Sequence, residues 1–138
     1  MPVPHGFGID SNNKIARMIS MIEALERYSC MHRPETGFVI SSLNELTCAM
    51  DPREMPWFKP EQYYSKDFVC VPFSPNDSLT WLEGRCLVNP VKRWILSDLV
   101  VWPSLESYPR ALATSSGTAA HWDPTIATLF ALDLLRNY

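Results

Sequence analysis

Two glutamates at helical spacing are the residues of this sequence best suited to chemistry. Glu23 and Glu26 lie three positions apart within residues 12–28, where apolar side chains recur every three or four positions and predict a helix. At about 100° per residue, Glu26 falls inside the apolar stripe of that helix. Glu23 lies at the edge of the stripe, beside Ser20 and Arg27. A carboxylate inside an apolar stripe is costly unless it is paired, protonated or bound to a metal.

Two interpretations of this glutamate pair are open. In the structural one, Glu23 forms an ion pair with Arg27 four residues later, and Glu26 pairs with a distant arginine or lysine. In the metal-binding one, both carboxylates hold Mg²⁺, which prefers oxygen ligands and is commonly bound by one or two carboxylates together with substrate phosphates. Arg27 would then contact a phosphate oxygen.

A third acidic residue, near the C-terminus, is open to the same two interpretations, structural and metal-binding. Asp133 lies on the same face as Leu129 and Phe130 in an apolar helix that we expect over residues 123–138. Burial beside Arg136 or a backbone donor is one interpretation. A further carboxylate on the metal side is the other.

The two helices that position these acids have clear start signals. Asp10, Ser11 or Asn12 can cap the first helix, and Asp123-Pro124 is a strong start for the second, because aspartate accepts from free N–H groups and proline suits the first turn. The second helix is apolar almost all the way round, which is typical of a buried helix. We expect it to leave exposed apolar surface on this chain, which self-association or a partner would cover.

The middle of the chain predicts a small antiparallel sheet and short turns. Asn89-Pro90 is a turn signal that predicts a hairpin between its flanking strands, and a brief helix is expected over residues 43–46. Strands are expected at residues 38–40, 79–88, 91–96 and 99–102. The predicted fold class is therefore α+β, with mixed helices and a small antiparallel sheet.

Composition excludes several classes of protein. The chain has 138 residues, 46% of them hydrophobic, which fits one soluble domain. It contains no apolar run near 18 residues and no N-terminal basic region followed by an apolar stretch, so we expect no membrane span and a cytoplasmic location. A net charge of −3 with scattered basic residues argues against nucleic acid as a partner.

Three further patterns do not point to a site. The four cysteines lack zinc-ribbon spacing, so reduced and mostly buried thiols are expected, with a zinc site as the minor alternative. The three histidines have no ligand spacing. Gly6-Phe7-Gly8 is not a dinucleotide-binding loop, because the third glycine is missing and no strand precedes it.

The first helix carries a string that is similar to a family signature. Ser20-x-x-Glu23-x-x-Glu26-Arg27 resembles the S-x-x-E-x-x-E-R stretch of YcaO proteins. Weaker matches follow in the same order along the chain, at residues 58–63 (F-x-P-E-Q-Y), 81–85 (W-v-x-G-r) and 115–121 (S-x-G-x-A-A/G). The resemblance implies one partial YcaO-like ATP-binding domain over residues 1–138, with motif helices at 12–29 and 123–138 and strands and loops at 36–114.

The resemblance also implies roles for individual residues, although it identifies no catalytic residue here. In the family, the two glutamates of the first helix hold Mg²⁺ on ATP. Carried over, the implied metal ligands are Glu23 and Glu26, with Asp133 added, and the implied ATP-binding residues are Ser20, Glu23, Glu26, Arg27 and Asn137. The family's second helix usually has an E-x-x-Q pair, and here those positions are Leu134 and Asn137, one residue away from Asp133.

The implied function is ATP- and Mg²⁺-dependent activation of peptide backbone amides. In this chemistry a nucleophile adds to an amide carbonyl, ATP phosphorylates the resulting oxygen, and loss of phosphate gives an azoline, amidine or thioamide. The implied partners are a peptide or protein substrate and a completing protein subunit or homo-oligomer. The alternative is a truncated, non-catalytic relative that acts as a binding or scaffold protein.

Overall fold

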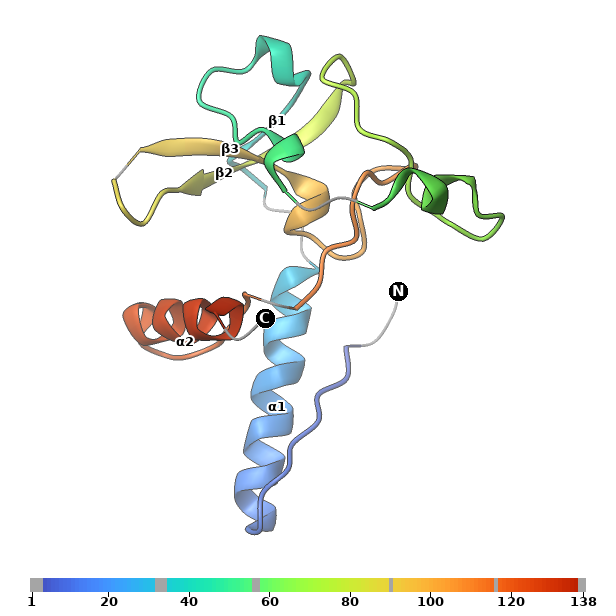
Figure 1. Ribbon diagram of the computed structural model, residues 1–138. Coiled ribbons are helices and arrows are strands. Elements are labelled where there is room, and N and C mark those ends of the chain that lie inside the picture. The colour runs from blue at the N-terminus through green and yellow to red at the C-terminus, as the bar shows by residue number, and fades with distance from the viewer. Residues whose placement is uncertain (1–3, 32–34, 56–57, 90, 116, 137–138) are drawn as a thin grey trace. The chain divides into compact units, whose positions relative to one another are not determined.

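The computed structural model describes residues 4–31, 35–55, 58–89, 91–115 and 117–136 (Figure 1). For residues 134–136 it describes the backbone alone. Its helices and strands are α1 (Asn13–Cys30), β1 (Phe38–Ser41), β2 (Leu79–Arg85), β3 (Lys92–Leu96) and α2 (Pro124–Arg136). Two helices and a three-stranded antiparallel sheet confirm the α+β class. The chain divides into two compact units, residues 1–32 with 115–138, and residues 33–114.

The first unit, residues 1–32 with 115–138, contains both α-helices, and their start signals are confirmed. The side chain of Asn12 accepts a hydrogen bond from the Lys14 amide at 2.9 Å, which selects one of the three expected caps of α1. Asp123 Oδ1 accepts from the amides of Thr125 at 2.8 Å and Ile126 at 3.4 Å. Both helices therefore begin within about one residue of the predicted position, because short side chains satisfy their first free N–H groups.

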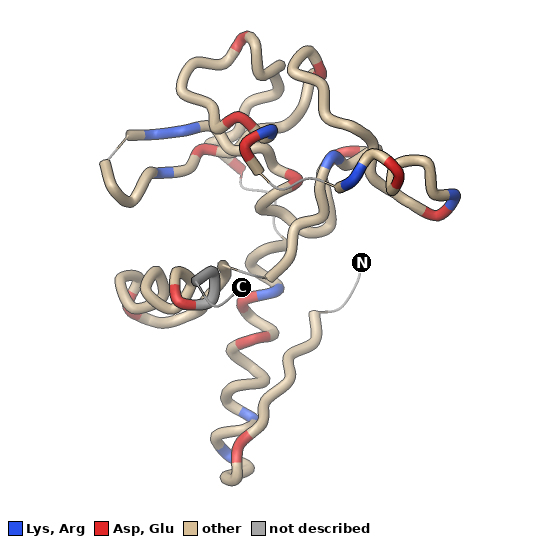
Figure 2. The backbone as a smooth tube through the Cα atoms, in the orientation of Figure 1, with Lys and Arg blue, Asp and Glu red and all other residues tan. Residues whose placement is uncertain are grey.

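The apolar faces of both helices are open within this unit. No residue of α1 is buried, and Leu129 and Phe130 of α2 are 59% and 54% exposed. The second helix is therefore not buried within the described chain, and the exposed apolar surface that we expect on it is present. Two helices and one extended segment do not offer enough surface to cover a helix that is apolar on all sides, and Figure 2 shows how sparse the charged positions are in the coloured part of α2.

The second unit, residues 33–114, is organised by the sheet, whose strand order is β1-β2-β3. Trp81 of β2 pairs with Val39 of β1 and with Leu96 of β3, so it occupies the centre of the sheet. It is fully buried with Leu79 and Leu96, and its indole N–H donates to the carbonyl oxygen of Ser41 at 2.9 Å. The predicted hairpin and the short helical turn at Leu43–Glu45 are confirmed.

The strand predicted over residues 99–102 is wrong. Ser97–Leu99 forms a 3-10 turn, and the amides of Val100 and Val101 both donate to the carbonyl oxygen of Ser97, at 2.9 and 2.8 Å. These bonds turn the chain away from the sheet, so the two valines do not extend it. The third strand is instead β1, which pairs with β2 across about forty positions of sequence.

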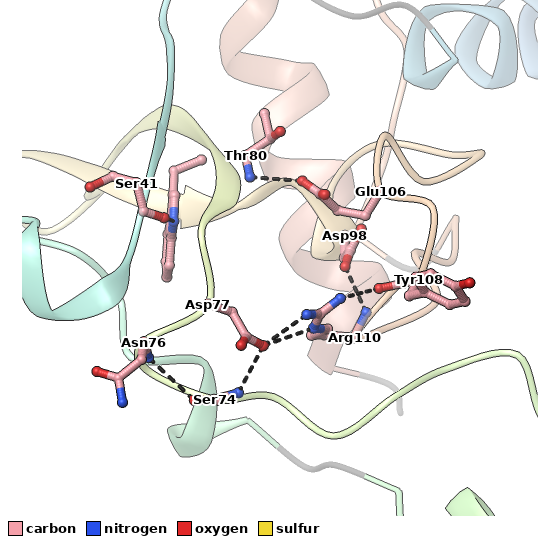
Figure 3. Close-up of polar contacts among 10 residues, drawn as sticks. Ser41, Ser74, Asn76, Asp77, Thr80, Asp98, Glu106, Tyr108 and Arg110 are labelled. Carbon is pink, nitrogen blue, oxygen red and sulfur yellow. Dashed lines mark hydrogen bonds and ion pairs between the residues drawn. The ribbon is translucent and has the colours of Figure 1, made fainter.

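A buried carboxylate fixes the loop that follows this turn (Figure 3). Asp98 has no exposed surface; its Oδ1 accepts from the Ser104 hydroxyl, and its Oδ2 accepts from the Arg110 amide at 2.7 Å. The Arg110 guanidinium in turn binds Asp77 Oδ2 at 2.8 Å. Burial, more than any other cause, raises the pKa of the Asp98 carboxyl above its usual range.

In the part of the chain that the structure describes, no helix combines the length and the apolar character needed to cross a bilayer.

The four cysteines are free thiols in unlike surroundings, and only Cys70 is buried. Burial raises the pKa of Cys30 and of Cys70, whereas backbone N–H groups of Asn89 and Val88 in the hairpin loop lower the pKa of Cys86. Because the thiolate is the reactive form, we expect iodoacetamide to label Cys86 faster than Cys30 and Cys70 near neutral pH.

A time course of alkylation followed by peptide mass spectrometry measures these rates. In urea the surroundings of the three thiols become alike, so their rates should converge. Faster labelling of Cys70 than of Cys86 in the folded chain would contradict the expected order.

Candidate functional site

The carboxylate of Glu23 is held at both oxygens. Arg27 Nη2 donates to Glu23 Oε1 at 2.6 Å, which is the ion pair that the structural interpretation predicts. The backbone amide of Phe7 donates to Glu23 Oε2 at 2.5 Å. A carboxylate oxygen can accept from two directions, so each oxygen of Glu23 keeps capacity for one more partner. The ion pair with Arg27 therefore does not exclude a metal-binding role.

The Phe7 amide reaches Glu23 because residues 6–8 lie directly on the backbone of α1 (Figure 1). A Cβ atom on Gly6 would lie 1.9 Å from the Ser20 carbonyl oxygen, and one on Gly8 would lie 1.8 Å from that of Ala16. Neither contact is possible for a side chain, so only glycine fits at the two positions. The Ser20 hydroxyl donates to the Gly6 carbonyl at 2.9 Å and ties the segment to the helix.

Glu26 has a different kind of partner. The hydroxyl of Thr118 lies 2.5 Å from Glu26 Oε1 and 2.7 Å from the Ser115 carbonyl oxygen, and its single hydrogen can serve only one of them at a time. Within the described residues, Glu26 thus meets a neutral hydroxyl and not the arginine or lysine that the structural interpretation predicts. Its charge is left uncompensated by any ion pair there.

Open space lies beside Glu26. A hollow of about 400 Å³ is bounded by α1, α2 and the loop that precedes α2. Its lining consists of Glu26, Leu25 and small side chains, among them Ser29, Cys30, Gly117, Thr118, Ala120 and Ala127. An uncompensated carboxylate at the wall of such a hollow is accessible to a hydrated cation or to a ligand that carries one.

Ser20 belongs to a second hollow. It lines a space of about 550 Å³ together with Arg17, Asn13 and residues 6–8, among others. Arg17 forms no ion pair with another described residue. The structure thus brings Ser20 together with a free guanidinium, and it places Glu26 beside the other hollow.

The remaining predicted site residues are placed less fully. Asp133 lies on α2 with an exposed side chain, and Asn137 lies outside the described residues. In the described ranges, no three His, Cys, Asp or Glu side chains come close enough together to hold a metal ion. A cation at Glu23 or Glu26 would therefore need further ligands from water or phosphate.

Three contributors to this region were not assigned from the sequence. Arg17 is three residues before Ser20, and this spacing places it on the same helix face, which was a usable signal. Thr118 lies in the loop that the sequence singled out, but its hydroxyl had no assigned role. The Phe7 amide gave no signal, because every residue except proline carries this group.

Comparisons with known proteins show the family of the chain. The sequence matches the family described as YcaO cyclodehydratase, ATP- and Mg²⁺-binding, over residues 7–132. This match covers most of the chain, so the chain belongs to the YcaO family. No curated protein matches it.

Solved structures resemble it in fold. The heterocyclase TruD superposes with a TM-score of 0.70 at 21% identity, over 83% of this chain and 19% of TruD. A heterocyclase in complex with substrate and cofactor gives 0.73 at 20% identity, over 90% of this chain and 18% of that protein. YcaO from Methanopyrus kandleri, bound with AMPPCP and Mg²⁺, gives 0.54 at 19% identity, over 91% and 28%. The chain thus spans between 18% and 28% of these proteins.

Proposed function

We propose that this chain is the ATP- and Mg²⁺-binding part of a YcaO-type enzyme that activates peptide backbone amides by phosphorylation, giving azoline, amidine or thioamide products. The observation that carries the proposal is Glu26, a carboxylate with no ion pair among the described residues, at the wall of an open hollow. The family description and the YcaO bound with AMPPCP and Mg²⁺ support the choice of ligand.

The residues present fit a magnesium ion carried by a nucleotide. Mg²⁺ keeps several waters and is usually bound by one or two carboxylates plus phosphates. Glu23 and Glu26 can supply the carboxylates, and the nucleotide supplies the phosphates. The bound ion would neutralise charge on the phosphoryl group during transfer. The proposed metal ligands are Glu23, Glu26 and Asp133, and the proposed ATP-binding residues are Ser20, Glu23, Glu26, Arg27 and Asn137.

The observed hydrogen bonds set conditions on these roles. Arg27 uses one of its five N–H groups on Glu23, so the others can bind a phosphate oxygen without breaking that pair. Ser20 has a single hydroxyl hydrogen, which it donates to Gly6. To donate to a phosphate, Ser20 must release Gly6, whereas Arg27 need not move away from Glu23.

We also propose that the whole enzyme needs a peptide or protein substrate and a completing protein subunit or a second copy of the chain. The exposed apolar side chains of α1 and α2 support this part of the proposal, because large apolar surfaces usually contact another protein. The second candidate function is a non-catalytic binding or scaffold protein. Leu134 and Asn137 at the positions of the family's E-x-x-Q pair favour that alternative.

Calorimetric titration of Mg²⁺·ATP into the purified chain tests the proposed function. We expect saturable binding that Glu26→Ala weakens by more than about tenfold, which corresponds to 1.4 kcal/mol. Glu61→Ala is the matched control, since Glu61 is an exposed glutamate in the other unit. Excess EDTA should weaken ATP binding by the wild-type chain much as Glu26→Ala does.

The outcomes separate the two candidate functions. Loss of affinity in Glu26→Ala but not in Glu61→Ala supports the ATP- and Mg²⁺-binding role. Absence of binding in a chain with a native circular dichroism spectrum would overturn that role and favour the scaffold alternative.

A further inference from the structure

The contact between Phe7 and Glu23 joins the N-terminal segment to a proposed metal ligand. The donor is the backbone amide, and the side chain of Phe7 is 72% exposed and takes no part in the bond. The two residues are sixteen positions apart, so the bond exists only because the chain runs back along α1. We call residues 6–8 the glycine clamp.

The glycine clamp packs so closely on α1 that its backbone has little conformational freedom. Both glycines lie so close to the helix backbone that a Cβ atom on either one would collide with it. The backbone atoms they approach belong to Ala16, Ser20 and Ala24. The hydroxyl of Ser20 adds a bond to the Gly6 carbonyl at 2.9 Å. The amide between the two glycines is therefore delivered to one place beside the helix.

A glutamate on an open helix face has several rotamers, and holding one of them costs conformational entropy. Here two donors already hold the carboxylate of Glu23, the Phe7 amide at 2.5 Å and Arg27 Nη2 at 2.6 Å. Donors to a charged carboxylate form the stronger class of hydrogen bond. Groups that orient a metal ligand in this way typically change metal affinity by about 10- to 100-fold when they are removed.

We propose that the glycine clamp is a positioning element, which orients Glu23 through the Phe7 amide so that its unused lone pairs can bind Mg²⁺. This inference rests on the proposed function, because it presumes that Glu23 is a metal ligand. The clamp acts through its backbone, and the identity of the side chain at position 7 is unimportant to the role.

Two substitutions at one position separate backbone from side chain. Phe7→Pro removes the amide donor, and Phe7→Ala keeps it while deleting the exposed ring. We expect Phe7→Pro to bind Mg²⁺·ATP about 10- to 100-fold more weakly than the wild-type chain. Phe7→Ala should stay within about twofold of wild type, since only solvent-exposed atoms are lost.

A second readout distinguishes positioning from general damage. ATP binding in excess EDTA does not use the metal ligands, so Phe7→Pro and Phe7→Ala should bind metal-free ATP equally. Equal losses with and without the metal would overturn the positioning role. Equal affinities of the two variants for Mg²⁺·ATP would overturn it as well.

The clamp itself can be measured without any ligand. By nuclear magnetic resonance, the Phe7 amide of the ligand-free chain should exchange slowly with solvent, and Glu23→Ala should remove this protection while Glu26→Ala leaves it. Unchanged protection in Glu23→Ala would show that the Phe7 amide does not donate to Glu23 and would overturn the positioning role. Where Phe7→Pro fails to fold, Gly8→Ala displaces the same segment by collision with Ala16, with Ser11→Ala as its control.

Failure of the proposed function gives a different result. If the wild-type chain binds no Mg²⁺·ATP, the proposed function and the positioning role both fall. Protection of the Phe7 amide that depends on Glu23 would then identify the bond as a structural tie between the N-terminal segment and α1.

Discussion

Replacing Asp98 by alanine should destabilise residues 33–114 by about 2–4 kcal/mol, because the Arg110 amide and the Ser104 hydroxyl would lose their acceptor inside the protein. Domains of this size have a total free energy of unfolding of about 5–15 kcal/mol, so the loss is a large fraction of it. Urea unfolding followed by circular dichroism and tryptophan fluorescence measures the change. Asp67→Ala, an exposed position, is the control. A cost below about 1 kcal/mol would show that Asp98 does not hold the loop.

Asp98 should also make the free energy of unfolding depend on pH. Burial raises the pKa of Asp98 in the folded state above its unfolded value, so folding favours the protonated form. The stability that this proton contributes is complete below the unfolded pKa of about 3.9 and is lost as the pH rises through the folded pKa. The free energy of unfolding of the wild-type chain minus that of Asp98→Asn should therefore fall as the pH is raised from about 3. A difference that rises with pH would contradict the direction of the shift.

The second large effect is expected at Trp81. This residue is fully buried at the centre of the sheet, between Leu79 and Leu96, and Trp81→Ala should cost about 3–5 kcal/mol through lost burial and the cavity that remains. Trp81→Phe keeps most of the packing but loses the hydrogen bond to Ser41, so a cost of about 1–2 kcal/mol is expected beyond the small change in volume.

Denaturant unfolding of the three proteins, measured under identical conditions, gives both values. The order wild type, Trp81→Phe, Trp81→Ala is the prediction. If Trp81→Phe were as unstable as Trp81→Ala, the indole hydrogen bond and not the packing would dominate, and the core would have to be described differently.

The sequence predicted the helices and the hairpin because their signals are local. Asn12 and Asp123 are capping residues next to long periodic segments, and Asn89 lies in a turn between two apolar runs. The strand at residues 99–102 failed for the opposite reason. Its valines have strand-like composition, but the amides that follow Ser97 bond back to the Ser97 carbonyl, and composition alone does not reveal that turn.

In the candidate site, too, the local contacts could be predicted from the sequence and the long-range contacts could not. Spacing was enough to predict that Glu23 and Glu26 lie on one helix and that Glu23 forms an ion pair with Arg27. The other partners could not be predicted, because Phe7 is 16 positions away from Glu23 and Thr118 is 92 positions away from Glu26. Periodicity also marked the apolar faces of the helices, but it carries no information on whether the rest of the chain covers them.

The seat of residues 6–8 on α1 also governs which substitutions the N-terminal segment can accumulate over time. Positions 6 and 8 are confined to glycine by the helix backbone, whereas position 7 contributes through its main-chain amide and can accept any side chain except that of proline. Drift in this segment is therefore restricted to alternate positions. A period of two residues normally indicates a strand with one buried face. Here the close approach of a helix backbone causes it, and not a sheet or a core.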